Sequence, residues 1–454
     1  MLYAILTHNF RIICFEQGKL VPREITNISD LSEVAYLSKI TDKYSITNYE
    51  KNMWYDFQTH VINRSIPSGH LTLEKANIDI YNIKHDSGYM RVHPGEKNVV
   101  DFLVPTPNLW EEFRILTIEE LSALMFLVKN EWYLTNSNNT VKVNSNLSNH
   151  SQISFGELFI DFNELINAIC DNSNQYNNIF LDFTFNIDWK VYKAFLYKPA
   201  IIFVLFGQGY TFDQLEVSLK SLAVVGEYSG DVFIVTKEPS KDLQSIIPQS
   251  ILPRVKIIQM EGNDTLDFIS ARIPMLCSNL LDTYQPILYS DADIVFDRNI
   301  NEILSKATTA KQCSAQIEYF HIFQESDHNG GSFFKQDSFD MPKVHGFNSG
   351  LLLVPNMKNH KNSFKAAYKS LMNYTTLHGR NLPFADQSIL NYVLYKLNDF
   401  NPSPISEQTQ IGGKPSEFNK FDPNKPKGFV HFWNTAEKNI NMKKYLDNYL
   451  IKKK

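Results

Sequence analysis

Two aspartates one residue apart follow an apolar run in the segment PILYSDADIVFD, at positions Asp291 and Asp293. Carboxylates at that spacing can jointly hold a hard divalent cation, and such a cation can neutralise a diphosphate. Two solvated carboxylates in a turn are the alternative, because acidic residues are common at strand ends. The pair therefore marks a candidate metal site, and the residues around it must decide between the two interpretations.

Further polar motifs accompany the acidic pair in a fixed order. Upstream lies the helix-like segment FISARIPMLCSNLL, which contains Arg272. Downstream come HGFNSGLLLVPN, then PFADQSILNYVL, then GFVHFWN. Five ordered motifs at these spacings are far more specific than any one of them alone.

At these motifs the chain resembles glycosyltransferase family 8, which comprises retaining, nucleotide-sugar-dependent enzymes with a GT-A fold. The resemblance covers Ala200 to about Tyr445. It implies an α/β domain with a mixed, mostly parallel sheet that transfers a hexose from a nucleotide-diphosphate sugar. A UDP-sugar is the donor that the family favours, and the acceptor would be a glycan, a lipid-linked molecule or a protein.

The resemblance also implies a metal site. Asp291 and Asp293 match the acidic pair that binds Mn²⁺, or Mg²⁺, and His431 in the run FVHF matches the histidine that completes the site. A neutral imidazole beside two carboxylates suits Mn²⁺. Taken alone, His431 would be interpreted as a core histidine.

Three residues match the positions that contact the donor. Arg272 corresponds to an arginine whose planar guanidinium suits phosphates or sugar hydroxyls, although alone it would be a surface charge. Asn348 and Ser349 match the segment that the donor sugar approaches. The flanking Gly346 and Gly350 let the backbone come close, or they simply mark the start of a strand.

Asp386 and Gln387 match the pair expected beneath the sugar, as catalytic residues. Asp386 would accept a sugar hydroxyl and Gln387 would lie near the anomeric centre, whereas a helix capped by Asp386 is the alternative. Gln387 is a poor nucleophile, so only Asp386 offers a carboxylate for a covalent intermediate. We therefore favour front-face departure of the nucleotide diphosphate, with its charge stabilised by the metal.

Two departures from the family pattern affect donor binding. After the first strand the family has acidic residues and an asparagine that read the base and ribose, whereas this chain has Phe206, Gly207, Gln208 and Gly209. Gly207 and Gln208 are therefore the candidates for donor binding there, and the base stays open, with uridine as the family default.

The second departure concerns the phosphate-binding lysine. The glycine and lysine that normally follow the histidine fall on Asn434 and Glu437, and Lys438 comes one residue late. Lys438 is our candidate replacement. Lys414 in IGGKP is another, although a plain loop is the simpler interpretation of that segment.

The elements that must position these motifs form a regular pattern from Ala200 onward. The apolar run IIFVLF is followed by the helical segment DQLEVSLKSLAVV and by the runs DVFIVT and VKIIQM. This order predicts a parallel sheet covered by helices. Ligands bind such sheets beyond the carboxyl ends of the strands, where the acidic pair is expected.

The chain divides near residue 195, which predicts a β-rich domain over 1–195 and the GT-A domain over 196–454. Three stretches of the first part have two β-type runs around a turn: Ala4–Pro22, Ile80–Pro105 and Ala123–Val143. They loosely resemble a β-trefoil of the fascin or lectin type, which would bind glycans. A β-rich domain without a ligand is the alternative.

Two segments have weaker signals. The stretch Lys311–Val344 separates the acidic pair from GFNSG, and we interpret it as an insertion that recognises the acceptor or as an inert surface loop. The basic tail NMKKYLDNYLIKKK predicts a peripheral contact with an anionic membrane surface or a solvated terminal helix.

Composition excludes several classes of protein. The formal charge of the 454-residue chain is −5, which argues against nucleic acid as a partner. The four cysteines form none of the short-spaced pairs that bind zinc, and we expect them to be buried apolar residues. Without an unbroken apolar N-terminal run or a stretch of about 18 apolar residues, we expect a cytoplasmic protein.

Two alternatives to the transferase remain. A haloacid-dehalogenase-type phosphatase also has an acidic pair after a strand, and Val295 fits its pattern, but that motif belongs on the opening strand of its domain. The other alternative is a catalytically inactive glycan-binding protein on a transferase scaffold. The replaced residues at the base-reading and lysine positions motivate it.

Overall fold

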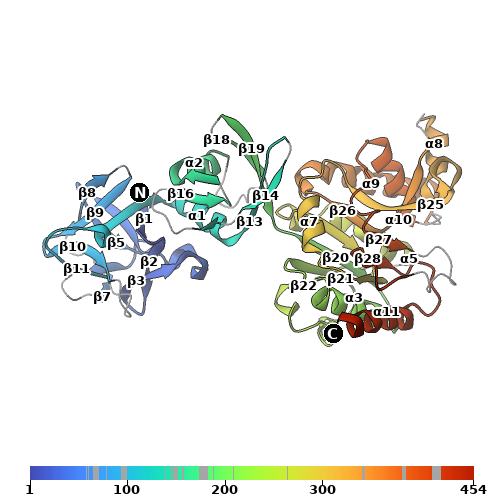
Figure 1. The fold of residues 1–454 in the computed structure, drawn as a ribbon, viewed down its shortest axis with the longest axis horizontal. Helices are drawn as coiled ribbons and strands as arrows, with labels where there is room; N and C mark the ends of the chain where they lie inside the picture. The colour runs from blue at the N-terminus through green and yellow to red at the C-terminus, as the bar shows by residue number, and fades with distance from the viewer. Residues whose placement is uncertain are drawn as a thin grey trace. The chain divides into compact units, whose positions relative to one another are not determined.

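The structure is a computed structural model, and it forms two compact units, Met1–Leu196 and Tyr197–Lys454 (Figure 1). The residues that the structure describes are 1–57, 59, 61–64, 71–77, 79–93, 100–137, 139–143, 145–146, 152–155, 158–172, 182–187, 189–207, 209–262, 264–339, 343–380, 385–411 and 421–453.

The first unit is built mainly from antiparallel strands. Its largest sheet has 12 strands: β1 (Leu2–Thr7), β2 (Arg11–Glu16), β3 (Lys19–Glu24), β4 (Tyr36–Ile40), β5 (Lys43–Thr47), β6 (Trp54–Asp56), β7 (Val61–Asn63), β8 (Thr72–Asn77), β9 (Ile80–His85), β10 (Gly88–Val92), β11 (Val100–Val104) and β12 (Glu112–Thr117). A second sheet contains β13 (Glu131–Thr135), β14 (Thr140–Val143), β18 (Asp182–Ile187) and β19 (Lys190–Tyr197). A third contains β15 (Ser145–Asn146), β16 (Gln152–Phe155) and β17 (Leu158–Asp161).

Two helices, α1 (Ile118–Lys129) and α2 (Phe162–Asn172), complete the first unit. Thr117 caps α1 through a capping box with Glu120, and the buried Leu124 joins the core between strands and helices. The expectation that Ala123–Val143 opens with a β-type run is therefore wrong, because its first residues lie in α1. The capping box of Thr117 and Glu120 marks the start of this helix, and the interpretation of the segment as a β-type run overlooked it. The β-trefoil comparison stays a prediction.

The second unit has a six-stranded sheet in the order β22-β21-β20-β23-β26-β25. Its strands are β20 (Ala200–Leu205), β21 (Asp231–Thr236), β22 (Val255–Gln259), β23 (Ile287–Ser290), β25 (Ser314–Ile322) and β26 (His345–Val354). The pairs β20–β21, β21–β22 and β20–β23 are parallel, whereas β26 runs antiparallel to β23 and to β25. The sheet is thus mixed and mostly parallel, as the sequence predicts.

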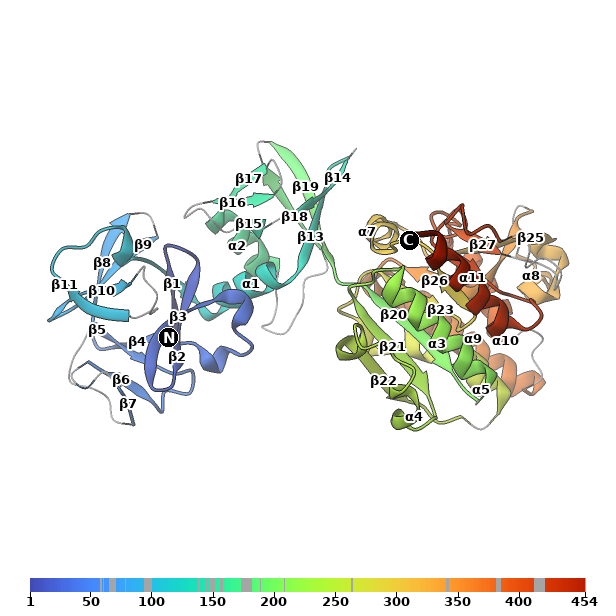
Figure 2. The ribbon, with the colours of Figure 1, turned by 60° about the horizontal axis from the view of Figure 1, so that its bottom comes forward.

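Helices cover both faces of this sheet, because its strands are apolar on both sides. The helices are α3 (Tyr210–Val224), α4 (Ser240–Gln244), α5 (Thr265–Ser270), α6 (Arg272–Leu276), α7 (Asn301–Ala307), α8 (Gly331–Asp337), α9 (Met357–His378), α10 (Ala385–Lys396) and α11 (Lys438–Lys453). Ile202 packs in one core with residues of α6, α9 and α10. Figure 2 shows α3 across the strands on the other face, with α11 beside it.

A small second sheet, β24-β28-β27, lies next to α3 and α11. It consists of β24 (Ile294–Phe296), β27 (Thr409–Ile411) and β28 (Phe429–His431). The apolar side of α11 packs against this sheet and α3, where Met442, Tyr445 and Leu446 are buried. Membrane contact by the tail stays a prediction, but these three side chains are already packed inside the unit.

Two further expectations need correction. The stretch Lys311–Val344 is not simply an inserted loop, because it begins with β25, a strand of the main sheet. Cys14 and Cys313 are buried as expected, whereas Cys170 and Cys277 are only partly buried. Among the described residues no helix has the length and apolar character needed to cross a membrane.

Candidate active site

The acidic pair lies in the turn between β23 and β24, where the chain leaves the main sheet for the small one. Strand β28 pairs with β24 in the register Ile294 to His431, and Phe432 N donates to Asp293 O over 3.0 Å. This register places His431 Nε2 3.3 Å from Asp293 Oδ1. One ligand atom from each of Asp291, Asp293 and His431 lies within 4.8 Å of the other two. The three side chains converge as metal ligands do.

Gly350 provides the space around this cluster. It sits in β26 beside the acidic turn, because Asp291 N donates to Gly350 O over 2.7 Å. A Cβ at residue 350 would lie 2.5 Å from Asp291 Oδ2 and 2.8 Å from His431 Cε1. Those atoms belong to two of the converging side chains, so a larger residue would push them apart.

Lys438 reaches the same cluster from the first turn of α11. Its Nζ lies 2.6 Å from Asp293 Oδ2. Burial alone would raise the pKa of Asp293, but the charges and hydrogen bonds of His431 and Lys438 outweigh it and hold that pKa below its usual range. Asp293 is therefore ionised and available to a cation.

Arg272 connects the acidic turn to α10. Its Nε lies 2.6 Å from Asp386 Oδ2, its Nη2 lies 3.3 Å from Asp291 Oδ1, and its Nη1 donates to Ser349 O. The guanidinium also stacks on the ring of Tyr289, 4.2 Å from the ring centroid. A buried guanidinium with this many partners has one fixed orientation.

Asp386 is almost completely buried in the first turn of α10. Burial raises the pKa of its carboxyl to about 6, although the positive charge of Arg272 opposes the shift and Asp291 adds to it. At neutral pH Asp386 is ionised and paired with Arg272. The carboxylate is thus held ready to accept a hydrogen bond in the pocket.

Gln387 and Ser349 are held by hydrogen bonds next to this ion pair. Gln387 Oε1 accepts from Ser349 N over 3.1 Å, and its Nε2 donates to Asn329 Oδ1 over 3.2 Å. Both ends of the Gln387 amide are therefore engaged. That arrangement suits a group that is positioned beside a substrate rather than one that attacks it.

Asn348 is oriented by a buried carboxylate that sequence reasoning missed. Its Nδ2 donates to Glu318 Oε1 over 3.0 Å, while its Oδ1 accepts from Gly350 N over 2.8 Å. Glu318 Oε2 also lies 3.4 Å from His328 Nε2. Glu318 comes from β25, and only the pairing of β25 with β26 brings it opposite the GFNSG motif.

Part of this arrangement lines a cavity of about 280 Å³. Its lining residues are Ile269, Arg272, Asp291, His328, Asn348, Ser349, Gly350, Asp386, Gln387 and Trp433. Sequence reasoning did not single out Ile269 or Trp433. Trp433 had an available signal, because it lies two residues after His431 in the same motif.

Two predicted donor-binding residues that the structure describes, Gly207 and Lys438, are not among the residues that line this cavity. Gly207 follows β20 with a φ of +101°, a backbone conformation that favours glycine, but it is not among the described residues that line the cavity. Gln208 and Lys414 fall outside the described residues.

Comparison with known proteins identifies this part of the chain. Residues 273–438 match the model of glycosyl transferase family 8. This matched part of the chain, residues 273–438, is called the family 8 segment below. The match confirms the resemblance predicted from the motifs, and with the mixed α/β sheet it confirms the expected fold class. The family 8 segment includes Asp291, Asp293 and His431, and it begins one residue after Arg272. No curated protein sequence matches the chain.

Solved structures give weaker likenesses. The bifunctional glycosyltransferase WbbM is 16% identical with a TM-score of 0.40, over 56% of this chain and 50% of that one. GlyE of Streptococcus pneumoniae TIGR4 is 16% identical with a TM-score of 0.36, over 57% of this chain and 64% of that one. The galactosyltransferase LgtC in complex with donor and acceptor sugar analogues is 14% identical with a TM-score of 0.39, over 56% and 95%. The chain thus matches half the length of WbbM.

Proposed function

We propose that this protein is a metal-dependent glycosyltransferase that moves a hexose from a nucleotide-diphosphate sugar with retention. The observation that carries the proposal is the convergence of Asp291, Asp293 and His431 beside a cavity that contains Arg272 and Asp386. That convergence occurs inside the family 8 segment. A UDP-sugar is the donor that we propose, and a glycan, lipid-linked molecule or protein is the acceptor.

The residues of the acidic turn fit Mn²⁺, or Mg²⁺. Two carboxylates and an imidazole form a suitable ligand set, and a glycine stands where a Cβ would crowd them. Lys438 Nζ already places one positive charge at this point. When bound, the metal would stabilise the negative charge of the departing diphosphate.

The protein's own residues would hold the donor and the sugar. Lys438 at the edge of the acidic turn is suited to binding phosphate oxygens. Asp386, fixed by Arg272, would accept a hydrogen bond from a sugar hydroxyl. Gln387 and Asn348, each held by a partner, would position the sugar without forming a covalent bond to it.

This arrangement supports front-face departure of the diphosphate. A double displacement needs a free carboxylate at the anomeric carbon. Asp386 is paired with Arg272, and the Gln387 amide is held at both ends, so neither is arranged as an attacking group. Asp291 is likewise engaged by Tyr289, whose hydroxyl donates to it over 2.5 Å. In a phosphatase of the alternative type the first aspartate would have to attack a phosphate. The hydrogen bond from Tyr289 to Asp291 does not favour that role.

The test is a nucleotide-release assay with UDP-, GDP- and ADP-hexoses, with Mn²⁺ or with EDTA. We expect Mn²⁺-dependent release from one donor by the wild type and none by Asp291→Asn or Asp293→Asn. Asp282→Asn, which changes a partly buried ion pair with Lys361 away from the residues that line the cavity, is the matched control and should keep full activity.

Two other results would contradict the proposal. If no donor is turned over and no nucleotide raises the thermal midpoint with Mn²⁺, the protein is not a transferase, and glycan binding by the full chain becomes the function to test. If the chain cleaves phosphomonoesters without any nucleotide sugar, the phosphatase interpretation takes its place.

A further inference from the structure

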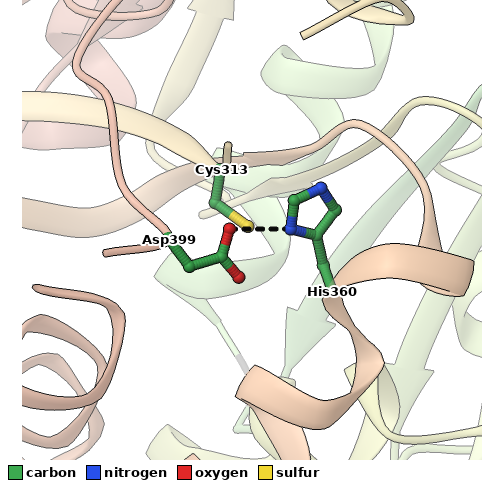
Figure 3. Close-up of side chains that lie close together, drawn as sticks. All are labelled: Cys313, His360 and Asp399. Atoms are coloured by element: carbon green, nitrogen blue, oxygen red, sulfur yellow. Dashed lines mark hydrogen bonds and ion pairs between the residues drawn. The ribbon is translucent and has the colours of Figure 1, made fainter. Parts of the chain in front are cut away.

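A second cluster of metal-ligating side chains lies in the same unit, outside the cavity described above. It consists of Cys313, His360 and Asp399 (Figure 3). One ligand atom of each lies within 4.8 Å of the other two. The residues come from three elements: Cys313 directly precedes β25, His360 belongs to α9 and Asp399 follows α10.

Backbone hydrogen bonds hold two of the three residues side by side. Cys313 N donates to Asp399 O over 3.2 Å, and Asn401 N donates to Cys313 O over 2.9 Å. His360 is brought in by the packing of α9, where it is buried. The cluster is therefore fixed by the fold and does not depend on flexible side chains meeting by chance.

The side chains are oriented toward one point. Asp399 Oδ1 lies 2.8 Å from His360 Nδ1, and Ser363 Oγ donates to Asp399 Oδ2 over 2.5 Å. Figure 3 shows the sulfur of Cys313 and the Asp399 carboxylate on the same side of the imidazole, at Nδ1. Carboxylates that ligate metals commonly accept a hydrogen bond from a neighbouring residue that fixes their orientation, and Ser363 is such a donor to Asp399.

This geometry excludes a catalytic triad. In a triad the nucleophile and the carboxylate lie at opposite nitrogens of the histidine, because one nitrogen takes the proton of the nucleophile while the N–H at the other donates a hydrogen bond to the carboxylate. Here both groups share Nδ1, and Nε2 points away from them (Figure 3). The cluster can bind a common atom but cannot activate the thiol for attack.

The charges suit a divalent cation. A thiolate and a carboxylate together balance two positive charges, which reduces the cost of burying the ion. Among the described residues no lysine or arginine forms an ion pair with Asp399, whose salt-bridge partner is His360. Cys313 is fully buried and Asp399 mostly so. The carboxylate therefore lies in the interior without a permanently charged partner.

The ligand set selects the metal. Zinc binds thiolate, imidazole and carboxylate with tetrahedral geometry, whereas Mn²⁺ and Mg²⁺ prefer oxygen ligands. Bonds of about 2 Å at tetrahedral angles separate the nitrogen and oxygen ligands by about 3.3 Å. The present separation of 2.8 Å would have to open only slightly.

We propose that Cys313, His360 and Asp399 form a zinc site with three protein ligands. On binding, the thiol proton is released to solvent and the imidazole proton moves from Nδ1 to Nε2. Zinc then bonds to the Cys313 sulfur, to His360 Nδ1 and to the Asp399 carboxylate, and a water molecule is the fourth ligand. The ion cross-links the start of β25, helix α9 and the segment after α10. Glu318 belongs to β25 and Asp386 to α10, so the zinc ion would stabilise two elements that position cavity residues. The ion itself would take no part in the transfer reaction.

The competing explanation is a metal-free hydrogen-bond network of His360, Asp399 and Ser363, with Cys313 as a packed apolar residue. Cobalt distinguishes the two, because a Co²⁺–thiolate bond gives a near-ultraviolet charge-transfer band. The acidic turn contains no cysteine, so metal bound there gives no such band. The readout is thus independent of the proposed transferase activity.

The experiment uses full-length protein from cells grown with Co²⁺ in place of Zn²⁺, and metal content is measured on the same samples. We expect one thiolate-bound cobalt per chain in the wild type, in Asp291→Asn and in Cys277→Ala. Cys313→Ala and His360→Ala should lose the band while keeping the far-ultraviolet circular dichroism of the folded protein. Asp399→Asn, which keeps the side-chain size, should bind more weakly.

A wild-type protein without the band, or a band that persists in Cys313→Ala, overturns the proposal. In zinc-grown wild type we also expect chelator at a raised temperature to lower the thermal midpoint, and the same chelator to leave Cys313→Ala unchanged. Should the Cys313→Ala chain not fold, Asp399→Asn and His360→Ala carry the test, since neither removes the sulfur.

Discussion

Lys438 Nζ lies 2.6 Å from Asp293 Oδ2. The ammonium group of helix α11 thus forms an ion pair with a carboxylate 145 residues earlier in the chain. Burial would lower the pKa of Lys438, but the charge of Asp293 and their hydrogen bond more than offset it, and the pKa is raised. The lysine stays protonated. It therefore competes with any metal for Asp293 until a phosphate offers it another partner.

Replacing Lys438 separates these two roles. We expect Lys438→Gln to tighten binding of Mn²⁺ alone by roughly fivefold to tenfold, because a charge pair of about 1 kcal/mol no longer competes. The same variant should bind nucleotide diphosphate more weakly in the presence of Mn²⁺. Calorimetric titration measures both constants, with the exposed Lys443→Gln on the same helix as the control. Weaker Mn²⁺ binding would show that the lysine assists the metal.

Adding one carbon at residue 350 should disable the metal site. In Gly350→Ala the new Cβ meets Asp291 Oδ2 at 2.5 Å and His431 Cε1 at 2.8 Å unless these side chains move. The residue lies inside β26, where an alanine fits the backbone, so the fold should persist. We expect at least tenfold weaker Mn²⁺ binding with unchanged circular dichroism. Unchanged Mn²⁺ affinity would mean that the cluster is not where the metal binds.

The pH dependence of transfer should report Asp386. Burial raises the pKa of this carboxyl to about 6, so it is neutral below that pH and ionised above it. If the ionised form accepts a sugar hydroxyl, activity at saturating Mn²⁺ rises with pH through about 6. Asp386→Asn should have low activity without this limb. A wild-type profile that is flat from pH 5 to pH 7 would remove Asp386 from the proposed role.

The same carboxyl should make stability fall as pH rises, whereas activity should increase. Because the pKa of Asp386 is raised on folding, its contribution to the free energy of unfolding is present below the unfolded pKa and is lost as pH rises through about 6. Denaturant titrations of wild type and Asp386→Asn at pH 5 and pH 7 should therefore show a pH-dependent difference between the two proteins.

Asp297 should matter for stability rather than for chemistry. This buried carboxylate accepts hydrogen bonds from Gly428 N, from Tyr445 Oη and from Gln410 Nε2, and so joins β24 to β28 and α11. We expect Asp297→Ala to lower the free energy of unfolding by about 2–4 kcal/mol, because it leaves buried donors unpaired. Tyr445→Phe, which removes one donor, should cost about 1 kcal/mol. Urea titration measures both, and equal effects would contradict this explanation.

Local sequence signals predicted the second unit well. Continuous apolar runs specify β20, β21 and β23, because strands covered on both faces must be apolar on both sides. The first unit was harder to predict. Helix α1 has β-branched and aromatic neighbours, and the identity of its core-facing side depends on which strands it meets.

The acidic pair was visible in the sequence, but its partners were not all visible. Glu318 is 30 residues from its partner Asn348, and no spacing rule connects the two. The same holds for Cys313, His360 and Asp399, which are widely separated in the sequence. Cysteine spacing does not predict the proposed zinc site, because that site has only one cysteine and its other two residues, His360 and Asp399, are distant in the sequence.

The sequence by itself determined the two-part organisation, the α/β character of the second part and the residue types of the acidic turn, because these depend on short-range pattern and composition. Only the tertiary structure decided that Lys438 contacts Asp293, that Arg272 pairs with Asp386, and that Gly350 leaves room between Asp291 and His431. These relationships follow from strand register and helix packing, which join segments up to 145 residues apart. The free energy that fixes them comes from the whole core, so no single motif contains it.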